Sequence, residues 1–142
     1  MPPKLVTYTT EQEYKTHFER VYCQGAIYTF DSIRVYFKKS DFQHCMYESS
    51  KRNKDKDQFS IARSQRIDWI KATLESPHAD LYEGWDKTNQ CYDKTRRVAI
   101  VYQDYVVVIR ISTKNHNQAT FVTAYVADNS ISKIRKSPKW KK

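Results

Sequence analysis

A short stretch in the first half of the chain carries several side-chain types that acid–base chemistry uses. Residues 41–52 read DFQHCMYESSKR and include the imidazole of His44 and the carboxylate of Glu48. Histidine and carboxylate side chains are the groups that most often transfer protons in enzymes. The stretch is therefore a candidate wall of a catalytic site, although both residue types are also common in polar surface turns.

Two arginines lie where a predicted helix should bury apolar side chains. We expect a helix over residues 59–75, because a step of about 100° per residue places Ile67 and Ile70 on one face. Arg63 and Arg66 fall on that same face. Arginine is rarely buried without a partner, so the pair indicates either ion pairs at the border of the core or a cleft that binds an anion. For the two arginines taken together we favour the cleft.

The last predicted strand, residues 119–126, contributes hydroxyl groups. Strict alternation along a strand places Phe121, Thr123 and Tyr125 on one face. Threonine and tyrosine are also favoured in ordinary strands, so these two hydroxyls do not indicate a site by themselves.

The composition argues against several other kinds of active site. Two glycines are too few for a phosphate-binding loop or a dinucleotide-binding turn. The four histidines are scattered without the spacing of metal ligands, and the three cysteines form neither a C-x-x-C pair nor an even set. We therefore predict no metal, no cofactor and reduced thiols, which leaves metal-independent acid–base chemistry.

Cleavage of RNA is one reaction that such residues can perform. It needs a base for the 2′-hydroxyl, an acid for the departing 5′-oxygen and positive charge around the phosphate. The candidates for proton transfer and substrate positioning are His44, Glu48, Arg63, Arg66, Lys71, Thr123 and Tyr125.

The formal net charge of +9 is concentrated at the C-terminal end. Residues 133–142 carry six cations and no acid. Such a segment can gather RNA through its phosphates, and we take Lys133, Arg135 and Lys136 as candidate substrate contacts. A solubilising, poorly ordered terminus explains the same charges equally well. Some order is favoured because the segment contains Trp140 and is interrupted only by Pro138.

The predicted elements describe a single α+β domain over residues 1–132, followed by the basic tail 133–142. A helix from Thr10 to Cys23 precedes a short hairpin, a loop with the opening motif, the helix over 59–75 and about four antiparallel strands. The strands are expected at Leu81–Trp85, Arg97–Tyr102, Tyr105–Ser112 and Ala119–Val126. No secretion signal or membrane-length apolar run occurs, so we expect a cytoplasmic protein without a membrane partner.

Several segments resemble a family of phage- and mobile-element-associated domains that is grouped with the barnase, EndoU, colicin and RelE nuclease superfamily. The resemblance covers about residues 41–140 and is carried by FQHCMYES, RSQRIDWIKATLESP, RRVAIVYQDYVVVIRIS and ATFVTAYVADNS. It implies N-terminal helices paired with a four-stranded antiparallel sheet whose face carries the active site. It also implies that His44 matches an early histidine, Arg63 or Arg66 a helix cation, and Thr123 with Tyr125 a last-strand motif.

The resemblance implies a metal-independent ribonuclease or a toxin, and we expect a metal-independent endoribonuclease, with a toxin as one form that this activity can take. Its partners would be RNA and an acidic antitoxin or immunity protein. The oligomeric state stays open, with a homodimer through the extra hairpin as one option. The alternative is a non-catalytic nucleic-acid-binding module or a phage accessory or interaction protein.

Overall fold

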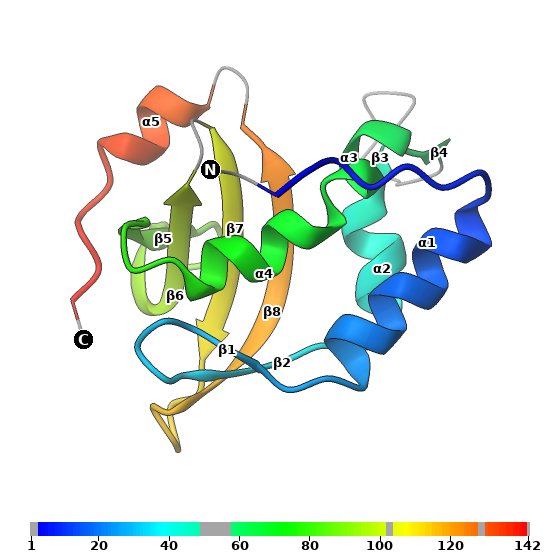
Figure 1. The fold of residues 1–142 in the computed structure, drawn as a ribbon. Coiled ribbons are helices and arrows are strands. Elements are labelled where there is room, and N and C mark those ends of the chain that lie inside the picture. Colours follow the sequence, from blue (N-terminus) through cyan, green and yellow to red (C-terminus); the bar gives the residue numbers. More distant parts are fainter. Residues whose placement is uncertain (1–2, 49–57, 102–103, 128–129, 142) are drawn as a thin grey trace.

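Four consecutive strands in the second half of the chain form an antiparallel sheet (Figure 1). They are β5 (Asp80–Asp86), β6 (Cys91–Val101), β7 (Tyr105–Ile111) and β8 (Gln118–Val126). Strand β7 is buried over nearly its whole length, which confirms the central position that its run of valine and isoleucine predicts. The structure is a computed structural model and describes residues 3–48, 58–101, 104–127 and 130–141.

The N-terminal hairpin joins this sheet instead of packing against it. β1 (Ile27–Tyr28) and β2 (Arg34–Tyr36) pair antiparallel, and β2 then runs parallel to residues 118–120 of β8. Over the described residues the sheet is therefore mixed and has six strands in the order β1-β2-β8-β7-β6-β5. The α+β class is confirmed, and the antiparallel core of four strands that we expected is extended by the hairpin.

The first helix begins where the sequence predicts. α1 (Glu11–Phe18) continues as a π-helical segment, η1 (Glu19–Cys23). The Thr10 hydroxyl accepts a hydrogen bond from the Glu13 amide, and the Glu13 carboxylate accepts one from the Thr10 amide. This reciprocal pair is the capping box that the spacing of Thr10 and Glu13 indicates.

The stretch that carries His44 forms a helix, α2 (Ser40–Met46), where we expected a loop. Three of its side chains are buried against the sheet: Phe42, Cys45 and Met46. They recur at helical intervals, but the intervening polar residues hide this short pattern in the sequence.

A second, two-stranded sheet follows α2. It pairs β3 (Tyr47–Glu48) with β4 (Gln58–Phe59). The charged run at 49–57, which we expected to be part of a loop, lies outside the described residues.

The predicted helix over 59–75 is divided into two. α3 (Ile61–Gln65) and α4 (Ile67–Glu75) meet at Arg66, whose φ of −94° and ψ of 21° interrupt the helical backbone. Ser60 caps α3 by accepting a hydrogen bond from the Arg63 amide at 3.2 Å. The prediction assumed that Arg63 and Arg66 share one continuous helical face. Because of the break, they do not.

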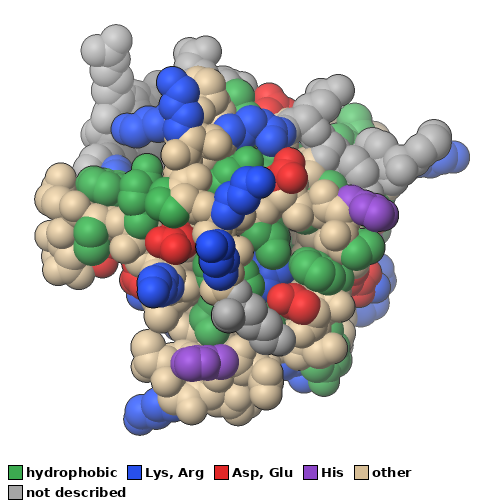
Figure 2. Space-filling view, turned by 90° about the vertical axis from the view of Figure 1, so that its left-hand side faces the viewer, with side chains coloured by type: hydrophobic (Ala, Val, Ile, Leu, Met, Phe, Trp, Pro, Cys, Tyr) green, Lys and Arg blue, Asp and Glu red, His purple; other side chains and the backbone are tan. Residues whose placement is uncertain are grey.

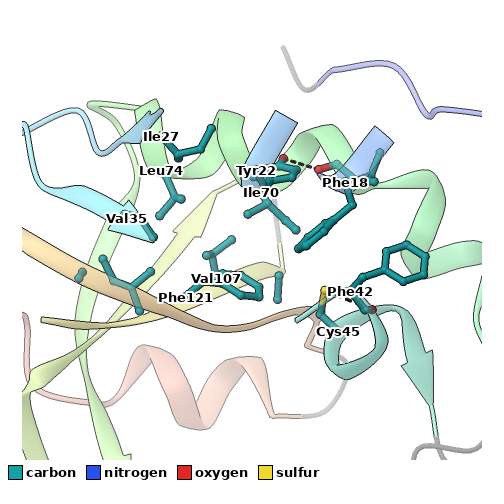
Figure 3. Close-up of a cluster of buried hydrophobic side chains, with 14 of the residues drawn as sticks. Phe18, Tyr22, Ile27, Val35, Phe42, Cys45, Ile70, Leu74, Val107 and Phe121 are labelled. Atoms are coloured by element: carbon teal, nitrogen blue, oxygen red, sulfur yellow. Dashed lines mark hydrogen bonds between the residues drawn. The ribbon is translucent and has the colours of Figure 1, made fainter. Parts of the chain in front are cut away.

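Two apolar clusters pack on opposite faces of the sheet. The larger lies between the sheet and α1, η1, α2 and α4, and Figure 3 shows Phe18, Tyr22, Ile70 and Leu74 meeting Val107 and Phe121 there. The smaller includes Val98, Val106 and Val108 and is covered by α5 (Ile131–Arg135) through Ile131 and Ile134. Among the described residues no helix is long and apolar enough to cross a membrane.

An irregularity in β8 changes which side chains share a face. The register between β7 and β8 shifts after Val108, so that Ile109 pairs with Phe121 but Val108 pairs with Thr123. Phe121 therefore belongs to the larger cluster, whereas Thr123 and Tyr125 lie on the face of the smaller one. The strict alternation that grouped Phe121 with Thr123 and Tyr125 is wrong for this reason.

The described part of the basic C-terminal segment is attached to the sheet. The Glu83 amide donates to the Pro138 carbonyl at 2.8 Å, and the Trp140 amide donates to the Leu81 carbonyl at 3.0 Å. These bonds extend the outer edge of β5, and an isolated bridge between Tyr82 and Lys139 lies between them. Residues 138–140 are thus structurally part of the domain.

Candidate active site

Four of the residues that the sequence singles out line one cavity. Glu48, Arg63, Arg66 and Tyr125 surround a hollow of about 220 Å³, which we call the arginine cavity. It lies beside the part of β8 that β2 does not pair with. The remaining wall includes side chains from α2, α4, β7 and β8, among them Cys45, Met46, Ile70, Tyr105 and Val126.

The two guanidinium groups are held in different ways. Arg63 Nε lies 3.8 Å from Glu48 Oε2, with 30% of the Arg63 side chain and 48% of the Glu48 side chain exposed. That distance is too long for a hydrogen bond, so the ion pair is loose. Arg66 Nη1 donates to the Ala62 carbonyl at 2.8 Å, and its guanidinium lies 5.4 Å from the centre of the Trp69 ring. Because a guanidinium carries five donors, each group can still bind oxygens of an anion.

Two tyrosines border the cavity, but they place their phenols differently. The charges of Arg63 and Arg66 act on the Tyr105 phenol, whereas the Tyr125 side chain lies on the sheet face of the smaller cluster. Burial raises the pKa of Tyr105 far above its ordinary value, and the charges of Arg66 and Arg63 oppose this rise only in part. Burial also raises the pKa of Tyr125. Both phenols therefore keep their protons at neutral pH and can act as hydrogen-bond donors.

His44 is not among the residues that line the arginine cavity. It is exposed on α2, where the apolar positions of the helix face the core. Burial raises the pKa of the nearby Asp41, and the charge of His44 opposes that rise. The structure therefore places His44 beside Asp41 on the surface and does not bring it together with Arg63 and Arg66.

The other predicted site residues are also distributed. Thr123 lies on the opposite face of the sheet, and Lys71 is 3.7 Å from Glu75 one helical turn away. Arg135 donates to Asp80 at 3.1 Å, and Lys136 is exposed outside the described cavities. Lys133 lines a separate groove under α5.

Sequence reasoning missed a hydrogen-bonded chain around a second histidine. His17 Nε2 lies 2.8 Å from Asp68 Oδ1, and its Nδ1 lies 2.8 Å from the Tyr8 hydroxyl. The chain ties the N-terminal segment to α1 and α4. No signal marks it in the sequence, because His17 and Asp68 are 51 positions apart. It lies away from the arginine cavity, whose lining includes neither residue, and we read it as a structural link.

In the described ranges, no group of three or more histidine, cysteine, aspartate or glutamate side chains is arranged to hold a metal ion. None of the three cysteines forms a disulfide with another described residue. No family model, curated protein or solved structure matches this chain.

Proposed function

We propose that this protein is a metal-independent endoribonuclease that holds the scissile phosphate in the arginine cavity. The observation that carries the proposal is that two guanidinium groups, a carboxylate and the protonated phenol of Tyr105 surround one hollow. At about 220 Å³ the hollow is smaller than the roughly 300–1,000 Å³ of typical small-molecule pockets. It suits a phosphate group with its adjoining atoms better than a whole nucleotide.

The residues of the cavity can be given complementary roles in one transfer. Glu48 takes the proton of the 2′-hydroxyl, whose oxygen forms a bond to phosphorus as the bond from phosphorus to the 5′-oxygen breaks. Tyr105 donates a hydrogen bond to that departing oxygen, which takes its proton from water. Arg63 and Arg66 stabilise the charge that develops on the phosphate oxygens. The products are a 2′,3′-cyclic phosphate and a free 5′-hydroxyl.

The loose ion pair supports this assignment. A phosphate is a better bidentate partner for a guanidinium than a carboxylate at 3.8 Å. When Arg63 turns to the phosphate, the Glu48 carboxylate is released from the ion pair and can face the 2′-hydroxyl. Substrate binding would thus prepare the base for the 2′-hydroxyl.

The test is cleavage of mixed RNA by purified protein in EDTA. We expect Arg66→Ala, Glu48→Gln and Tyr105→Phe each to lose most activity, while Arg20→Ala, an exposed arginine outside the cavity, keeps it. Products that lack a cyclic phosphate end, or equal activity in Arg66→Ala and Arg20→Ala, would contradict the mechanism. His44→Ala separates this assignment from the one based on resemblance: we expect activity to remain, and its loss would return the imidazole to the mechanism.

A second candidate function is a nucleic-acid-binding module that performs no chemistry. It is favoured by the groove under α5, which carries exposed aromatic rings and cations. If this second function is correct, the protein binds RNA in the same assay but releases no products. The RNA then stays intact with both wild type and Glu48→Gln.

The toxin reading of the proposed activity has a test in cells. A cytoplasmic ribonuclease that degrades cellular RNA should slow growth when expressed, and Arg66→Ala should relieve the effect. An acidic antitoxin or immunity protein would bind by neutralising the two arginines of the cavity. Normal growth in cells that contain soluble, active protein would contradict the toxin reading.

A further inference from the structure

A second hollow lies on the sheet face opposite the larger core. We call it the aromatic groove; its volume is about 630 Å³. Val98, Val108 and Tyr125 lie along its floor, and α5 contributes Lys133 on one side. The outer ends of β5 and β6 form the other side with Trp85 and Tyr92.

A break in the sheet register shapes this outer wall. Glu83 pairs with Arg97, but its neighbour Gly84 pairs with Asp93, so residues 94–96 bulge from β6. The Asp93 carboxylate accepts hydrogen bonds from the Thr95 amide at 2.8 Å and its hydroxyl at 2.7 Å. The Lys94 carbonyl accepts one from Trp140 Nε1 at 2.7 Å. The bulge is therefore braced from two sides.

Beyond the bulge, the hairpin presents an aromatic pair. Trp85 and Tyr92 are directly opposite each other, with ring centres 5.1 Å apart in an edge-to-face arrangement. Trp85 is 44% exposed and Tyr92 38% exposed. Cross-strand aromatic pairs stabilise hairpins, but a pair with only that role does not need to leave so much ring surface in water beside a groove.

Arg96 enters the groove because its neighbour on β5 has no side chain. A Cβ on Gly84 would lie 2.2 Å from Arg96 Cγ and 2.4 Å from Cδ, so only glycine leaves room for the arginine stem. Arg96 Nε is buried and has no hydrogen-bond partner among the described residues. A buried donor without a partner is costly, so an occupant of the groove that offers an acceptor to Arg96 would be stabilised.

The charges of the groove favour an anionic occupant. Lys87, Arg96 and Lys133 line it, against the carboxylate of Glu83. Figure 2 looks onto the side of the molecule that carries α5 and the C-terminal end, and it shows lysine and arginine side chains spread among carboxylates. Net charge alone therefore does not mark the groove; the combination of aromatic rings, cations and an unpartnered guanidinium nitrogen does.

We propose that the aromatic groove binds single-stranded RNA, with bases stacked on Trp85 and Tyr92 and phosphates on Arg96 and Lys133. Exposed rings bind unpaired bases through their faces, which a duplex hides within its own stack. The inference rests on the proposed function for its substrate class. The inference adds a binding site for the part of the RNA strand that lies outside the arginine cavity. The two hollows are neighbours, because Tyr125 lines both of them.

The test is the fluorescence anisotropy of a labelled single-stranded oligoadenylate, measured with the full chain carrying Glu48→Gln so that RNA is not cut. We expect Trp85→Ala to weaken binding about 5- to 150-fold, the usual effect of losing one stacked base. Tyr36→Ala is the matched control, because Tyr36 is 46% exposed on β2, near the opposite edge of the sheet. Trp85→Phe keeps a ring and should restore most of the affinity.

The outcomes separate this inference from the proposed function. Equal losses in Trp85→Ala and Tyr36→Ala, or equal affinity for a duplex of the same sequence, would overturn the groove as the binding site. If wild type cleaves RNA while Trp85→Ala binds normally, the groove falls and the ribonuclease stands. If binding depends on Trp85 but no cleavage occurs, the groove stands and the ribonuclease falls. Circular dichroism of each variant excludes unfolding as the cause of a loss.

Discussion

The buried ion pair between Arg97 and Asp31 predicts a large loss of stability from a single substitution. Arg97 on β6 is only 2% exposed, and its Nη1 lies 3.1 and 3.2 Å from the two Asp31 oxygens. Its guanidinium also lies over the rings of Phe30 and Trp140, at 5.5 and 4.8 Å from their centres. The pair therefore joins the β1–β2 loop, the sheet and the C-terminal end.

Arg97→Met removes the charge but keeps an apolar stem of similar length. Leaving one member of a buried pair uncompensated costs about 3–5 kcal/mol. Asp31 is 19% exposed and keeps a hydrogen bond from the Thr29 hydroxyl at 2.5 Å. We therefore expect the lower end, about 3 kcal/mol, or a fall in Tm of roughly 10 °C. The double variant Arg97→Met/Asp31→Asn should recover much of the loss, because no unpaired charge remains.

The effect should depend on pH with a defined sign. Burial alone would raise the pKa of Asp31, but the hydrogen bond from Thr29 and the charge of Arg97 outweigh it and lower this pKa. A carboxyl whose folded pKa is lowered contributes stability above its unfolded pKa of about 4, and that contribution is lost as the pH falls through the folded pKa. The difference in the free energy of unfolding between wild type and Arg97→Met should therefore become smaller as the pH falls.

Urea unfolding followed by tryptophan fluorescence, at a series of pH values, measures this difference. If Arg97→Met lowers the free energy of unfolding by less than about 1 kcal/mol at neutral pH, the ion pair does not stabilise the fold as we infer, because breaking a buried pair costs far more. A difference that stays constant down to the pH of acid unfolding would refute the assignment to Asp31.

Three further predictions follow from the same contacts. Gly84→Ala should weaken RNA binding, because the added Cβ would displace the Arg96 stem. Fluorescence anisotropy measures the affinity, and an unchanged affinity would contradict the role of Arg96 in binding. Thr10→Ala should lower the free energy of unfolding by about 1 kcal/mol through loss of the cap, as urea titration would show; an unchanged midpoint would mean that the cap contributes nothing. Ending the chain after Ser137 removes Trp140 and its bonds to β5 and Lys94, so calorimetry should record a lower Tm, whereas an equal Tm would indicate that this end is not attached.

The parts of the fold that the sequence predicts well are those with strong local signals. The capping box at Thr10 and Glu13 and the apolar run of β7 each depend on residues close together in the chain. The helix around His44 was missed because it has few turns and its buried positions are separated by polar residues. The parallel pairing of β2 with β8 joins segments more than 80 positions apart, and no local pattern specifies it.

The structure brings together some of the predicted site residues for the same reason. Arg63 and Arg66 both line the cavity, because they are near neighbours on one stretch of chain, although not on one continuous helical face. The groove was missed because Trp85 and Tyr92 meet only through the register shift at Gly84, and the sequence shows no more there than one of its two glycines. That rare glycine, placed inside the segment expected as the strand Leu81–Trp85, was the available signal.

Tyr125 connects the two proposals physically. The shift after Val108 places its ring on the groove face, while its position beside Ala124 and Val126 at the unpaired part of β8 also brings it to the arginine cavity. A strand bound in the groove would therefore reach Tyr125 before it reaches the two arginines. In that arrangement one residue of β8 borders both sites, with its ring in the floor of the groove. Binding of bases in the groove and cleavage of the phosphate in the cavity would then be coupled through this one position of the strand.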